Sequence, residues 1–146
     1  MATRGRRAPS SRMTKDQLIK LARGHAADAR GLRFESEVKE YFEKQGWKLA
    51  ARKAFKGREF DLVGKRGGGA FEDTEHLLVE CKRKQHVTAG DVTEFMYKVA
   101  RYYDSLPEIW GYKEPVHAYV AHTGSVNTDA MAVANRHKPP IRFKKF

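Results

Sequence analysis

The sequence predicts a mixed α/β fold in which helices flank a central mixed β-sheet, and two observations support this. The chain has 146 residues, the length of one ordinary domain, and its 40% of hydrophobic residues can build a core. Its hydrophobic patterns follow the order helix, three strands, helix, strand, helix. We expect a flexible basic arm over residues 1–13 and a single domain over residues 14–146.

A short helix is also expected before the first helix of this order. The sequence Thr14-Lys15-Asp16-Gln17 has the form of a capping box and predicts the start of a short helix. A second helix is predicted over about 34–45, because apolar residues recur from Phe34 to Phe42 at helical spacing and Gly46 can end it.

The later elements follow from a change of period. Alternating or short apolar runs predict strands over Trp47–Ala51, Phe60–Val63, Leu77–Cys81 and Val116–Val120. Thr88 can cap a helix that ends before Pro107. A short last helix is expected from Asn127 or Thr128 through Ala134.

Charge and cysteine content narrow the class of partner. Lysine and arginine number 29 against 18 acids, a net charge of +11, which favours a polyanion such as nucleic acid. Cys81 is the only cysteine, so a disulfide framework and a multi-thiolate zinc site are excluded. The chain shows neither a long apolar run nor a secretory signal, and we expect a cytoplasmic, DNA-associated protein.

The candidate catalytic residues lie on two predicted strands, near the strand ends. Asp61 lies in the second strand and Glu80 near the end of the third, with Lys82 on the same face as Glu80 because side chains alternate along a strand. If the two strands are hairpin neighbours, Asp61 approaches Glu80. Two converging carboxylates predict a site for a hard ion, Mg²⁺ with Mn²⁺ as substitute, and Lys82 could orient a water or stabilise a phosphorane.

A Glu-x-Lys tripeptide alone is weak evidence, and the sequence has two. Glu37-Val38-Lys39 lies on a predicted helix, where positions i and i+2 point in different directions. Glu80-Cys81-Lys82 follows an apolar strand and has Asp61 upstream, which favours a catalytic site over an ion pair on a solvated surface.

Three segments together carry a family resemblance. Gly31–Glu35 with Val38, then Phe60–Val63, then Leu78–Lys82 resemble the first helix, the Asp strand and the Glu-x-Lys strand of the PD-(D/E)xK nuclease superfamily. The chain is most similar to archaeal-type Holliday junction resolvases and Mrr-like restriction nucleases. The resemblance implies a restriction-endonuclease-like fold.

The resemblance also implies roles for individual residues. Asp61 and Glu80 would be metal ligands, Lys82 the catalytic lysine, Glu35 a further acid that completes the site, and the peptide carbonyl of Cys81 another ligand. Glu59 is the alternative third carboxylate. The sequence departs from the family in having Phe60 where proline usually precedes the aspartate.

Basic residues predict the contacts to DNA phosphates, although a solvated surface would have the same composition. One group lies in the arm and the other flanks the candidate site: Arg4, Arg6, Arg7 and Arg12, then Arg52, Lys53, Lys56, Arg58, Arg83 and Lys84.

These observations predict a metal-dependent, structure-selective DNA endonuclease. The first candidate is a homodimer that cuts four-way junctions by paired symmetric nicks, because nearly every residue is used by the nuclease core and no helix-turn-helix or finger remains to read base edges. The alternatives are an Mrr-like nuclease acting on modified duplex DNA and a non-catalytic DNA-binding protein.

Overall fold

The computed structural model describes residues 14–55 and 58–146, with backbone alone for 25–28, 51–55 and 58–59. The predicted arm, with Arg4, Arg6, Arg7 and Arg12, lies outside the described residues, as does Lys56. The chain divides into two compact units, Met1–Arg33 and Phe34–Phe146, and each is described by itself.

The first helix is longer than the sequence predicts. The capping box is present: the Thr14 amide donates to Gln17 Oε1 at 2.9 Å, and the Gln17 amide donates to Thr14 Oγ1 at 3.1 Å. The helix that follows, α1 (Lys15–Glu43), is continuous, so the expectation of two separate helices was wrong. No proline interrupts it, and Gly24 and Gly31 each cost only about 1 kcal/mol relative to alanine.

Within the second unit, α1 behaves as predicted. Phe34, Val38 and Phe42 are buried on one face. The chain leaves the helix at Gly46, whose φ of +92° is a left-handed conformation that glycine adopts without steric penalty.

The sheet has five strands in the order β1-β2-β3-β5-β7. They are β1 (Lys48–Phe55), β2 (Arg58–Gly67), β3 (Thr74–Lys82), β5 (Val116–His122) and β7 (Ile141–Lys145). The pairs β1/β2 and β2/β3 are antiparallel, whereas β3/β5 and β5/β7 are parallel. The four predicted strands are therefore present in a mixed sheet.

Three strands were not predicted. β7 follows the last helix, and the short strands β4 (His86–Val87) and β6 (Ser125–Val126) form a separate parallel pair. A two-residue strand has no period to detect. β7 lies at the sheet edge and only its first residue, Ile141, is buried, so its basic sequence resembles a tail.

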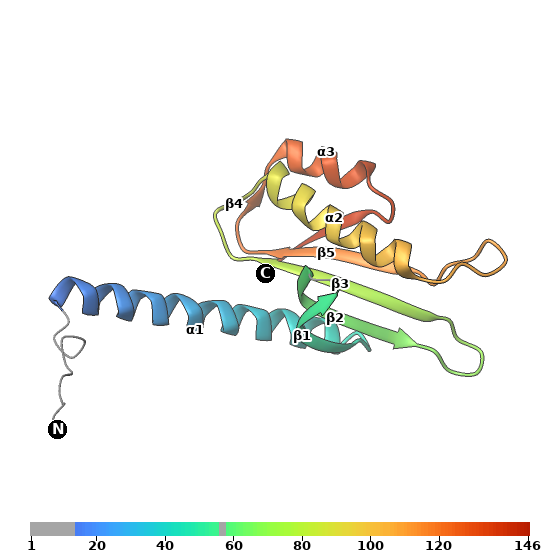
Figure 1. Ribbon diagram of the computed structural model, residues 1–146, viewed down its shortest axis with the longest axis horizontal. Helices are drawn as coiled ribbons and strands as arrows, with labels where there is room; N and C mark the ends of the chain where they lie inside the picture. Colours follow the sequence, from blue (N-terminus) through green and yellow to red (C-terminus); the bar gives the residue numbers. More distant parts are fainter. Residues whose placement is uncertain (1–13, 56–57) are drawn as a thin grey trace, which may run out of the picture. The chain divides into compact units, whose positions relative to one another are not determined.

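Two helices cover one face of the sheet, as Figure 1 shows. α2 (Ala89–Ser105) has the predicted cap at Thr88, which forms a reciprocal capping box with Asp91. α3 (Thr128–Arg136) begins after Asn127. In the described part of the chain, no helix combines the length and apolarity needed to cross a membrane.

The sheet separates two hydrophobic clusters. Leu78 and Val120 pack with residues of α2 and α3, whereas Leu77 and Val79 pack with α1 residues from Phe34 onward. Because its successive side chains enter opposite clusters, β3 is buried on both faces. This is the α/β arrangement that the sequence predicts.

Candidate functional site

Asp61 lies where β2 separates from β3. The described pairing of these strands ends at Leu62 and Val79. Asp61 instead accepts a hydrogen bond at Oδ2 from the backbone amide of Cys81, at 2.7 Å. Phe60 packs into the α2 cluster although Leu62 packs into the α1 cluster, so the regular alternation of β2 breaks at Asp61. A carboxylate from β2 is thereby fixed against the end of β3.

Glu80 lies at the end of the buried run of β3 and is 5% exposed. Its Oε2 atom is 3.3 Å from the Nζ atom of Lys98 and 4.0 Å from that of Lys82. Lys82 is the more accessible of these two lysines, with 26% of its side chain exposed against 15% for Lys98. One buried carboxylate therefore has two ammonium groups beside it.

The protonation of Glu80 reflects this environment. Burial and, second, the nearby charge of Asp61 raise the pKa of Glu80 to about 7, while Lys98 and Lys82 act in the opposite direction. The two carboxylates are thus close enough to repel each other in a poorly solvated place. A bound cation would relieve that repulsion.

Lys98 was not identified from the sequence. It lies on α2, three residues after Phe95 and one before Val99, both fully buried. A lysine flanking the apolar stripe of a helix needs an anionic partner when it is buried, and that was the available signal. The partner, Glu80, comes from a different element 18 positions away.

The two candidates for a third carboxylate, Glu35 and Glu59, are described only in part. Among the described residues, no three histidine, cysteine, aspartate or glutamate side chains are gathered as a metal site. Glu35 is half-buried on α1, next to Phe34 of the α1 cluster. The side chain of Glu59 lies outside the described residues.

The donor set fits a hard divalent ion. Asp61 and Glu80 contribute carboxylate oxygens, and the Cys81 backbone is adjacent to both through the Asp61 hydrogen bond. The Cys81 side chain packs against the α1 cluster, so its sulfur is directed away from Glu80, toward the other face of the sheet. These residues can hold Mg²⁺ or Mn²⁺.

Only some of the residues predicted to contact DNA lie among the residues whose side chains are described. Arg83 and Lys84 are exposed directly after β3, and Lys84 forms an ion pair with Asp91 at 2.7 Å. The side chains of Arg52, Lys53 and Arg58 lie outside the described residues.

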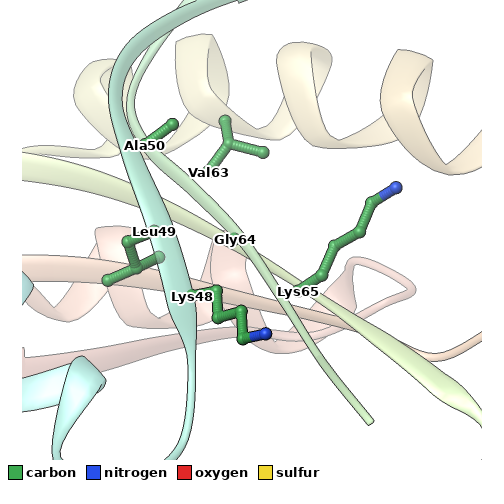
Figure 2. A pocket seen from close by; sticks show the side chains of 6 residues that line it. All are labelled: Lys48, Leu49, Ala50, Val63, Gly64 and Lys65. Atoms are coloured by element: carbon green, nitrogen blue, oxygen red, sulfur yellow. The ribbon is translucent and has the colours of Figure 1, made fainter. Parts of the chain in front are cut away.

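A separate hollow of about 410 Å³ lies over β1 and β2, above Gly64. Figure 2 shows the residues that line it: Lys48, Leu49, Ala50, Val63, Gly64 and Lys65. It has no carboxylate among these residues, so it offers no ligand to a metal ion.

A scan against protein families matches residues 26–144 to the restriction endonuclease family Mrr_cat. The chain belongs to that family. Mrr_cat membership confirms the predicted relationship to PD-(D/E)xK nucleases. Such nucleases typically use divalent metals. No curated protein sequence matches the chain closely enough to count as a relative.

Solved structures support the restriction-endonuclease-like fold of this Mrr_cat chain. The DNA modification-dependent restriction endonuclease AspBHI has a TM-score of 0.54 at 16% identity, over 99% of this chain and 38% of its own. A repair endonuclease from Pyrococcus abyssi has a TM-score of 0.51 at 20% identity, over 83% of this chain and 46% of its own. The chain thus spans less than half the length of these proteins.

Proposed function

We propose that this Mrr_cat chain is a metal-dependent DNA endonuclease whose site is formed by Asp61, Glu80 and Lys82. The observation that carries the proposal is the buried Glu80 carboxylate, which faces Asp61 and has two lysines within 4.0 Å. An isolated ion pair at a solvated strand end would need neither the burial nor the second carboxylate. The same set speaks against a protein that only binds DNA.

In this proposal Asp61, Glu80 and the Cys81 carbonyl hold the metal, and Glu35 or Glu59 supplies a further carboxylate. Bound Mg²⁺ or Mn²⁺ would lower the pKa of a water and polarise a phosphodiester oxygen. Hydrolysis joins the water oxygen to phosphorus and breaks one phosphorus–oxygen ester bond; one proton of the water ends on the leaving oxygen and the other stays with the new phosphate hydroxyl.

The protein's own groups have distinct tasks. The Cys81 amide fixes Asp61 through their 2.7 Å hydrogen bond, and Lys98 holds the Glu80 carboxylate in place. Lys82 is half-buried at the end of β3, and its exposed part can contact a DNA phosphate that approaches from the solvent side. Its ammonium group would stabilise the negative charge that develops on the phosphoryl oxygens.

Two substrates are candidates. Membership of the restriction endonuclease family Mrr_cat favours cleavage of duplex DNA, and AspBHI, which shares the fold, is a DNA modification-dependent restriction endonuclease. Four-way junctions, cut by a homodimer, are favoured by a different observation. Apart from the short β4/β6 pair, the described strands of the second unit form a single sheet, and its helices pack on that sheet. No described element of the second unit is left over to read base edges, so recognition by this unit would depend on DNA shape.

One assay tests the proposal and separates the substrates. Linear duplex, methylated duplex and a four-way junction of the same sequence are incubated with the full chain and Mg²⁺ or EDTA. We expect cleavage that EDTA and Asp61→Asn abolish. Paired nicks confined to the junction would assign a resolvase, whereas cleavage confined to methylated duplex would assign an Mrr-like nuclease. EDTA-resistant cleavage, or none, would refute the metal-dependent endonuclease.

A further inference from the structure

A polar hollow lies directly beyond the candidate site. It has a volume of about 380 Å³ and is lined by Arg83, Lys84, Gln85, Thr123 and Gly124, the loops that follow β3 and β5. These two strands are parallel neighbours, with Lys82 paired to His122 at their ends. The hollow therefore begins one residue after the candidate catalytic lysine.

Backbone contacts fix one wall of this hollow. A Cβ atom at Gly124 would overlap the carbonyl oxygens of Lys84 and Gln85, so the two loops touch through their backbones. The Ser125 amide donates to the Gln85 carbonyl at 2.9 Å, and His122 Nδ1 donates to the Gly124 carbonyl at 2.9 Å. The position of the wall does not depend on flexible side chains.

The charges in the hollow match a single anionic group. Lys84 is neutralised by Asp91 at 2.7 Å. Arg83 is exposed and, within the described part of the chain, forms no hydrogen bond or ion pair. The exposed Thr123 adds a hydroxyl donor. One uncompensated guanidinium with a hydroxyl suits the single negative charge of a phosphodiester.

We propose that the hollow binds a DNA phosphate next to the one that is cut, with Arg83 as its main ligand and Thr123 as a second donor. The inference rests on the proposed nuclease function. It assigns Arg83 a role in positioning the DNA strand over Lys82, separate from the hydrolysis step.

A cleavage experiment tests this role. Single-turnover rates are measured on duplexes in which one phosphate beside the mapped cut is replaced by a neutral methylphosphonate. At one flanking position, we expect the methylphosphonate and Arg83→Ala each to slow cleavage by about tenfold, or about 1.4 kcal/mol, and the combination to slow it no further. Arg101→Ala, an exposed change ten residues along α2 from Asp91, should leave the methylphosphonate effect intact. Additive losses at every position would overturn the proposal.

A binding experiment does not depend on cleavage. The full chain is titrated by NMR with a thymidine dinucleotide, which carries one phosphodiester. We expect amide shifts confined to 83–85 and 123–124 that Arg83→Ala and Thr123→Val weaken. Shifts elsewhere, or stronger binding of inorganic phosphate than of the dinucleotide, would overturn the proposal. Localised shifts in a chain that cuts no DNA would instead refute the nuclease function alone.

Discussion

Replacing Glu80 by glutamine should change how the stability of the protein depends on pH. In the metal-free protein, burial and Asp61 raise the pKa of Glu80 from 4.5 to about 7. Glutamine has nearly the same shape and resembles the protonated acid. We therefore expect the metal-free wild type and Glu80→Gln to have similar stability where Glu80 is protonated and to diverge where it is ionised.

The sign and size follow from proton linkage. Between pH 4.5 and 7 the unfolded chain has released the Glu80 proton while the folded chain retains it, so the free energy of unfolding falls as pH rises. The fall ends above pH 7. A pKa difference of 7 − 4.5, about 2.5 units, corresponds to about 3 kcal/mol at about 1.36 kcal/mol per unit. This is the opposite of the usual carboxylate, which stabilises the fold at neutral pH.

Urea denaturation in EDTA at pH 5 and pH 8 measures the effect. Glu80→Gln should gain stability over the wild type by roughly 2–3 kcal/mol on going from pH 5 to pH 8. Glu40→Gln is the control, because Glu40 forms only an exposed pair with Lys44 and should show no such change. If the difference in free energy of unfolding between Glu80→Gln and wild type does not vary with pH, the account of a buried carboxylate with a raised pKa is refuted.

The remaining predictions concern activity and DNA binding. Asp61→Ala should lower the cleavage rate by at least about 10²-fold while DNA affinity in a filter-binding assay stays near wild type, and a wild-type rate would remove Asp61 from the site. Lys82→Ala should lose most activity but keep its Mg²⁺ affinity by calorimetry; full rescue by added Mg²⁺ would show that Lys82 only shapes the metal site and does not act in the hydrolysis step. Lys98→Met should raise the pKa of Glu80 further and weaken Mn²⁺ binding at pH 7, roughly fivefold for a rise of one unit, with recovery at pH 9 and in Lys98→Arg; equal weakening at both pH values would contradict this. Deleting residues 1–12 should reduce the salt dependence of DNA affinity, each lost phosphate contact lowering the log–log slope by about 0.9, and an unchanged slope would show that the arm makes none.

Local patterns in the sequence were sufficient to predict that Asp61, Glu80 and Lys82 lie close together. Alternation along β3 fixes Glu80 and Lys82 on one face, and the hairpin between β2 and β3 brings Asp61 to the same strand end. Both follow from neighbours in the chain or from adjacent strands. The caps at Thr14 and Thr88 were predictable for the same reason, since each depends on residues three positions apart.

Contacts between distant elements could not be predicted. Lys98 reaches Glu80 only because α2 packs on the sheet beside β3, and the two residues lie 18 positions apart on different elements. The loops of Arg83 and Gly124 meet because β5 pairs beside β3, and strand order is set by packing of the whole sheet. The continuity of α1 was not predicted, because Leu32 is the only large apolar residue between Ala22 and Phe34 and no apolar stripe joins the two predicted helices.

The position of β3 determines how the site responds to partial unfolding. This strand pairs on both sides and contributes to both hydrophobic clusters, so its amides from Leu77 to Glu80 should exchange with solvent only when the whole second unit unfolds. Glu80 is the last residue of this protected segment, whereas Arg83 and Thr123 are exposed and lie on the loops that follow β3 and β5. In mild denaturant, Arg83 and Thr123 would therefore lose their positions before Asp61 and Glu80 separate. The affinity for DNA would fall at a lower denaturant concentration than the affinity for the metal ion.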